Sequence, residues 1–184
     1  MRRPFVDLQD HPDARSAAER ISGERWGRIS ALYGMLLHSP PVAEGWVGLG
    51  TAVRRRTGLD DRLRELAICL VARVCDQGYE WQNHAPLARD AGATEEELMA
   101  LLDRGACDSF SELDRAVLDL AEATARGNAT DELITAASER LGDRTLTEVV
   151  ATAAYYVGTA HFLNAFGIGT GSPTFLSPDQ ELPT

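Results

Sequence analysis

The sequence contains few cysteines, and their number and spacing argue against a disulfide framework. Its three cysteines are Cys69, Cys75 and Cys107, and no two of them form a CxxC pair. An odd number of thiols without such a pair is not typical of a disulfide framework. Free thiols are typical of a reducing compartment, so the sequence predicts a cytoplasmic protein.

Basic residues are also fewer than acidic ones. The 184 residues include 18 Lys and Arg against 28 Asp and Glu, which gives a formal net charge of -10. Nucleic-acid affinity depends on basic residues that neutralise phosphates. A nucleic-acid partner and an anionic membrane surface are therefore not expected. A small anionic substrate remains compatible with this charge, because one arginine can dominate a pocket.

Long apolar runs are absent as well. The most apolar run, LAICLVARVC, spans residues 66–75 and contains Arg73, whereas a membrane-spanning helix needs about 20 apolar residues. The run instead predicts a buried helix. The first ten residues, MRRPFVDLQD, have two arginines but no apolar segment after them, so they do not predict an export signal.

Alternating strand-like patterns, low-complexity linkers and internal repeats are likewise missing. Apolar residues recur at helical spacing almost throughout, which predicts an all-α fold. A chain of this length suits one domain, expected to cover residues 1–184 with an extended C-terminal tail from about residue 168. The expected helices are 25–39, 40–58, 60–77, 79–92, 94–105, 111–127, 131–142 and 145–167.

Three helix starts carry a capping-box pattern, in which Ser or Thr precedes an acid by three residues. These are Thr94–Glu97, Ser111–Asp114 and Thr145–Glu148. Glycines supply two stop signals: Gly78 is expected to break the long apolar helix, and Gly92 is expected to end the helix that follows.

The segment GYEWQNH, residues 78–84, holds the main candidates for chemistry. Glu80 and His84 are four residues apart, so they share one face of a helix. Near a helix N-terminus a carboxylate is stabilised and an imidazolium is disfavoured. A neutral histidine beside an ionised glutamate can act as a base and proton shuttle. The alternative is an exposed salt-bridged pair of little energetic value.

Glu65, on the preceding helix, is the third catalytic candidate. If it faces the start of the next helix, two carboxylates share one pocket with His84, and their titrations are pushed apart. The alternative places Glu65 on the exposed stripe of its helix. Carboxylates and an imidazole can bind metal, but no HExxH motif is present, so neither a metal nor another cofactor is expected.

Residues 62–102, RLRELAICLVARVCDQGYEWQNHAPLARDAGATEEELMALL, resemble the carboxymuconolactone decarboxylase family, which includes the alkylhydroperoxidase-D-like proteins. The resemblance implies an all-helical fold assembled as a homotrimer or homohexamer. In the redox branch of the family, the CxxC cysteines would fall on Gln77 and Glu80. The family histidine falls on His84 and the upstream glutamate on Glu65. The acid and the base are therefore retained, whereas the redox thiols are replaced.

The substrate-binding candidates are residues around this segment and on the last helix. Tyr79 and Trp81 flank Glu80 and line either a pocket or the core, and Gln77 takes a position that the resemblance marks. His161 lies on the apolar C-terminal helix, where a histidine is more often a hydrogen-bonded core or interface residue.

The function expected from these residues is that of a cofactor-independent lyase or isomerase acting on a small carboxylated or lactone compound. Glu80 and His84 would transfer the proton, and Arg62, Arg64 or Arg73 would hold a substrate carboxylate. Two alternatives remain. One is a peroxidase-type oxidoreductase with a single thiol, and the other is a non-catalytic, ligand-binding helical oligomer.

Overall fold

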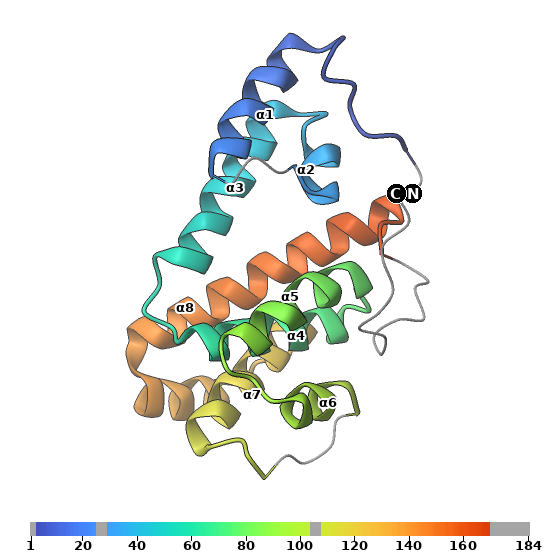
Figure 1. The fold of residues 1–184 in the computed structure, drawn as a ribbon. Helices are drawn as coiled ribbons and strands as arrows, with labels where there is room; N and C mark the ends of the chain where they lie inside the picture. Colours follow the sequence, from blue (N-terminus) through green and yellow to red (C-terminus); the bar gives the residue numbers. More distant parts are fainter. Residues whose placement is uncertain (1–2, 25–28, 104–107, 170–184) are drawn as a thin grey trace. The chain divides into compact units, whose positions relative to one another are not determined.

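The computed structural model describes residues 3–24, 29–103 and 108–169, and within these ranges the chain forms helices and no strands. The all-α prediction is therefore confirmed (Figure 1). In chain order the helices are α1 (Pro12–Glu24), α2 (Ala31–Leu36), α3 (Pro40–Arg55), α4 (Asp61–Val74), α5 (Gly78–Asp90), α6 (Glu95–Asp103), α7 (Glu112–Arg126) and α8 (Asp131–Phe166).

The helices divide into two compact units. The first comprises residues up to Thr57 together with Ala165–Ile168, and in it α3 packs against α1 and α2. The second comprises Gly58–Asn164 with the residues from Gly169, and it contains every catalytic candidate. That residues 1–184 form one domain remains a prediction. Cys107 and most of the expected tail, from residue 170, lie outside the described residues.

Helix α4 is the centre of the second unit, because α5, α6 and α7 all pack against it. Ten consecutive residues of α4, from Leu63 to Ala72, are buried. A helix that is covered on most sides can be apolar almost all round, which explains the apolar run in the sequence. Each fully buried leucine in it contributes about 1.5–3 kcal/mol relative to exposure.

Two of the three predicted helix caps are confirmed. The backbone N–H of Thr94 donates to Glu97 and that of Glu97 donates to the Thr94 hydroxyl, at 2.8 and 3.2 Å. Ser111 and Asp114 exchange the same two bonds at 2.9 and 3.1 Å. The third start was predicted wrongly. The chain bends at Gly142, whose φ is 75°, and Thr145 lies inside the helical stretch that follows.

The turn between α4 and α5 differs from the predicted one by a few residues. Gly78 does not break a helix, because α4 ends at Val74 and Gly78 is the first residue of α5. The reversal is made by Asp76, which has a φ of 50°, a left-handed conformation that aspartate tolerates better than most residues. Gly92, with a φ of 101°, follows the end of α5 as predicted.

None of the helices formed by the described residues is long and apolar enough to span a membrane.

Candidate functional site

The packing of α5 on α4 brings Glu65 and His84 together. The two residues are 19 positions apart, and Oε2 of Glu65 lies 2.6 Å from Nδ1 of His84. Glu65 is 4% exposed and His84 is 5% exposed. Inside a protein a hydrogen bond of this kind is stronger than in water. Glu65 therefore fixes the orientation of the imidazole ring.

Glu80 approaches the other nitrogen of the same ring. Its Oε2 lies 3.6 Å from Nε2 of His84, one helical turn away on α5. Glu80 is 5% exposed. The pair is therefore buried, and it is not the solvent-exposed salt bridge that was the alternative.

This arrangement gives the two ring nitrogens different roles. When Nδ1–H of His84 donates to the Glu65 carboxylate, Nε2 carries a lone pair and faces Glu80. The distance of 3.6 Å is longer than a hydrogen bond, so a small movement or a bound ligand is needed to connect the two groups. A side-chain triad of this geometry can remove a proton at one end and stabilise the resulting imidazolium at the other.

Of the three candidate arginines, only Arg64 reaches the triad. Its Nε and Nη2 lie 3.4 Å from Oε1 of Glu65, and its Nη1 donates to Asp61 at 2.7 Å. Arg62 is instead bound to two acids on α6 and α7, Glu97 and Asp114.

Arg73 has a different task. Its Nε donates to the carbonyl of Leu102 at 3.1 Å, which ties α4 to the end of α6.

One tyrosine of α8 packs on the histidine and a second packs on that tyrosine, and the site residues predicted from the sequence did not include either of them. The ring of Tyr156 meets the His84 ring edge-to-face at a centroid distance of 4.9 Å. Tyr155 meets Tyr156 in the same manner at 5.2 Å. Tyr156 is 3% exposed, so it shields one side of the imidazole from water. In this unit α8 therefore runs beside α5 (Figure 1).

Gln77 positions the start of α5. Its side chain is fully buried, its amide oxygen accepts the backbone N–H of Tyr79 at 2.9 Å, and its amide nitrogen donates to Asn164 at 2.8 Å. Asn164 in turn donates to the carbonyl of Cys75 at 3.0 Å. Gly169 lies so close that a Cβ there would collide with Gln77 and Tyr79. These contacts fix the first turn of α5, on which Glu80 stands.

The remaining two predicted substrate-binding residues lie in different surroundings. Trp81 belongs to the hydrophobic core cluster that also contains Cys69 and Leu98. His161 is exposed on α8, so it is not a core residue of this chain; its predicted place at an interface or in substrate binding stays a prediction. The structure thus brings together Glu65, Glu80 and His84, with Gln77 and Tyr79 at the helix start. That these residues line a pocket remains a prediction.

The two described cysteines are poor candidates for thiolate chemistry. Burial, followed by the nearby carboxylate of Glu65, raises the pKa of Cys69 well above its usual range. Burial also raises the pKa of Cys75. The thiolate is the nucleophilic form of cysteine, so both residues are held in their less reactive form at neutral pH.

Among the described residues, no group of three His, Cys, Asp or Glu side chains is arranged to hold a metal ion. The expectation of a metal-free and cofactor-free site remains a prediction.

Comparison with known proteins defines the class of this fold. Debrominase Bmp8, solved alone and as a variant with 2,3,4-tribromopyrrole, superposes with a TM-score of 0.72. The identity is 15%, over 89% of this chain and 88% of Bmp8. A peroxidase-related protein from Ralstonia eutropha JMP134, described as an alkylhydroperoxidase AhpD core, also has a TM-score of 0.72. Its identity is 16%, over 91% of this chain and 95% of that one. The fold is therefore AhpD-like.

The sequence comparison supports the resemblance to one family. The profile of the carboxymuconolactone decarboxylase family matches residues 40–123, a range that includes Glu65, Glu80 and His84. The predicted resemblance to this family is thereby confirmed. No curated protein matches the chain.

Proposed function

We propose that the protein is a cofactor-independent lyase or isomerase that uses acid-base chemistry on a small carboxylated or lactone compound. The observation that carries this proposal is the buried triad, in which His84 lies 2.6 Å from Glu65 and 3.6 Å from Glu80. Burying a histidine between two carboxylates opposes folding, and clusters of buried titratable groups of this kind are typical of functional sites.

Each group of the triad has a separate role in the proposed reaction. Glu65 holds the proton on Nδ1 and orients the ring. Nε2 of His84 and the carboxylate of Glu80 then exchange a proton with the substrate. Positioned groups of this type accelerate proton transfer by about 10²–10⁴-fold.

Two reactions use this proton transfer. In an isomerisation, the base removes a proton from a carbon beside a carbonyl, and the electron pair moves into an enolate. The same group then returns the proton to another carbon of the conjugated system. In a decarboxylation, the bond to the carboxylate carbon breaks and CO2 leaves. The electron pair that remains on the substrate takes a proton from the Glu80 and His84 pair, which enters this reaction with one proton on the Glu80 carboxyl or on Nε2 and regains it from water.

The test begins with a screen for ligands. Small aromatic, muconate-type and lactone acids are tested for thermal stabilisation of the protein. Those that bind are incubated with it in D2O, and NMR follows deuterium entering the carbon skeleton or CO2 leaving it. We expect Glu80→Gln and His84→Gln each to lower turnover by about 10²–10⁴-fold. The double variant should lose little more than the worse single variant, because the two groups act as a unit.

Matched control variants separate the loss of a catalytic group from a general loss of folded structure. His11→Gln and Glu139→Gln make the same changes at exposed positions outside the triad and should keep full turnover. Unchanged turnover in Glu80→Gln and His84→Gln would overturn the proposal. Ligands that bind but never exchange a proton would instead support the non-catalytic binding module.

A further inference from the structure

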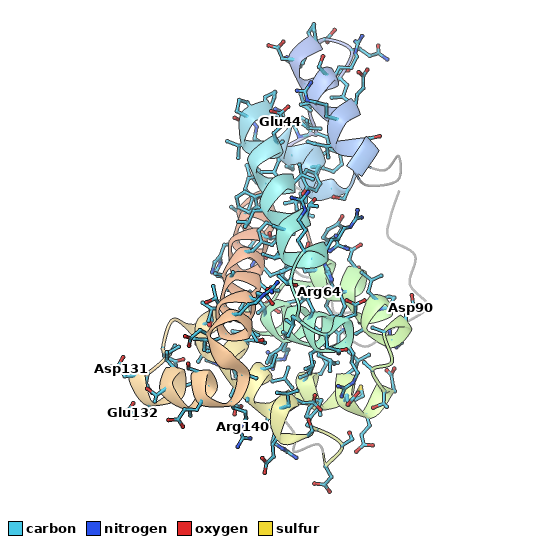
Figure 2. The ribbon with its side chains drawn as sticks, turned by 90° about the vertical axis from the view of Figure 1, so that its left-hand side faces the viewer. Glu44, Arg64, Asp90, Asp131, Glu132 and Arg140 are labelled. Atoms are coloured by element: carbon cyan, nitrogen blue, oxygen red, sulfur yellow. The ribbon has the colours of Figure 1, made fainter. Side chains whose placement is uncertain are left out.

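Arg64 joins the buried triad to the surface of the protein. Its guanidinium lies between Asp61, whose side chain is 77% exposed, and Glu65, whose side chain is 5% exposed. Arg64, labelled in Figure 2, belongs to the first turns of α4 and is itself 9% exposed. It is therefore a cation between solvent and the proton-transfer groups.

The two contacts of Arg64 differ in strength. Nη1 donates to Asp61 at 2.7 Å, whereas the two bonds to Glu65 are both 3.4 Å long. The shorter distance is the normal length of a charge-assisted hydrogen bond. The shortest of these hydrogen bonds from the buried arginine is therefore made to Asp61, a carboxylate that is mostly exposed to water.

Asp61 can leave Arg64 easily. Ion pairs between residues three or four apart on a helix are weak, and water solvates the 77% exposed Asp61 side chain well once it is released. Asp61 also stands in the first turn of α4, where the helix N-terminus stabilises a carboxylate whether or not it is paired. Rotation of Asp61 into solvent would expose Nη1 of Arg64.

We propose that Arg64 is the anchor for a ligand carboxylate, and that Asp61 occupies the anchor until the ligand displaces it; this rests on the proposed function of the triad. The exchange replaces one carboxylate by another, so the number of carboxylates bound to Arg64 is unchanged. Addition without exchange would place a third carboxylate at the guanidinium, beside Asp61 and Glu65. Asp61 thereby selects for ligands whose carboxylate binds Arg64 better than its own.

The proposal predicts a specific pattern of binding. Asp61→Ala removes the carboxylate that competes for Arg64, so muconate should bind about twofold more tightly. This size is expected because the ion pair between Arg64 and the exposed Asp61 is weak. Arg64→Gln removes the charged donor and should weaken binding by about tenfold or more. In the double variant the gain from Asp61→Ala should vanish, because the two residues act on one site.

Calorimetry with muconate and with its uncharged dimethyl ester measures this pattern. Because Arg64→Gln leaves Glu65 without a cation, Arg64→Lys is the second variant. It should fold like the wild type but recover only part of the affinity, since lysine lacks the planar fork. The exposed pair Arg89 and Glu95 on α5 and α6 gives the matched controls Arg89→Gln and Glu95→Ala, which should bind like the wild type.

Several results would overturn the anchor. These are equal binding by Arg64→Gln, equal binding of the ester, or no muconate binding by the wild type at all. The outcome is separable from that of the proposed function. If muconate binding does not depend on Arg64 while Glu80→Gln still abolishes proton exchange, only the proposed role of Arg64 as the anchor is wrong. If binding depends on Arg64 but no proton is exchanged, only the acid-base function is wrong.

Discussion

Glu65 adds a third group to the pair of Glu80 and His84 on α5, and it orients the His84 ring. Its bond to Nδ1 of His84, at 2.6 Å, leaves Nε2 as the basic nitrogen. In Glu65→Gln the amide can donate to Nδ1 and stabilise the opposite tautomer. We expect turnover to fall by about 10²–10⁴-fold, as for other orienting carboxylates. The D2O exchange assay measures the loss, and an unchanged rate would show that Glu65 does not orient the ring.

Substitutions of Asp76 test the left-handed backbone conformation of the turn before α5. Its φ of 50° is unfavourable for a residue with a branched Cβ. Asp76→Val should therefore destabilise the protein by about 1–2 kcal/mol. Asp76→Gly, which suits the conformation, should stay within about 0.5 kcal/mol of the wild type. Urea denaturation compares the two, and equal stability of both variants would contradict this account of the turn.

Cys75 tests the peroxidase alternative. The residue is near the start of α5, but burial raises its pKa, and Gln77 and Glu80 occupy the positions of the family's redox pair. We expect no peroxide consumption in an assay that supplies a thiol reductant, because burial disfavours the Cys75 thiolate that peroxide chemistry requires. Peroxide turnover that disappears in Cys75→Ser would establish the oxidoreductase instead.

At the scale of the helices, Arg62 is the main electrostatic connection. It extends from α4 to Glu97 of α6 and Asp114 of α7, whose side chains are 3% and 9% exposed. Burial opposes the ionisation of Asp114, but hydrogen bonds from Arg62 and Ser111 outweigh it and hold its pKa below the ordinary value of 3.8. Arg62 thus helps to keep Asp114 ionised, and it links α4 to α6 and α7 through its ion pairs with Glu97 and Asp114.

Arg62→Gln should lower the free energy of unfolding by about 3 kcal/mol at neutral pH, because it leaves buried carboxylates without their cation. A carboxylate with a lowered pKa stabilises the fold above its unfolded pKa, and this contribution is lost as pH falls through its folded pKa. The difference between variant and wild type should therefore shrink below about pH 4. Urea titrations at several pH values measure it, and a constant difference would contradict the mechanism.

Local signals in the sequence were sufficient for much of the helical architecture. The capping pairs at Thr94 and Ser111 were predictable, because each cap involves residues only three positions apart. Thr145 has the same pattern but lies after a bend at Gly142, and a local pattern cannot tell a cap from a continuing helix. Helix α1 was not predicted at all, although Ile21 and the alanines beside it are buried.

The candidate site was predictable only in part, for a similar reason. The spacing of Glu80 and His84 follows from helical geometry, and the family resemblance indicated Glu65. Tyr156 and Asn164 come from α8, more than 70 residues further along the chain. Their contacts with His84 and Gln77 depend on how helices pack, which no local pattern encodes.

At the scale of the whole molecule, two apolar side chains of α3 are exposed in the part of the chain that the structure describes. Val42 and Leu49 of α3 are 47% and 52% exposed. They are seven residues apart, so they lie on the same face of the helix. Full burial of such a side chain contributes about 1.5–3 kcal/mol, which favours association through this face.

We therefore expect a homo-oligomer, a trimer or hexamer of the 20.0 kDa chain, as the resemblance implies. A trimer or a dimer of trimers is a closed assembly that repeats one interface. Leu49→Glu should shift the mass towards the monomer, because it places a charge where an apolar contact is expected. Leu113→Glu, at a leucine of α7 that is 47% exposed, is the matched control and should leave the assembly intact. Light scattering at micromolar concentration measures the mass, and a uniform monomer of the wild-type chain would reject the prediction.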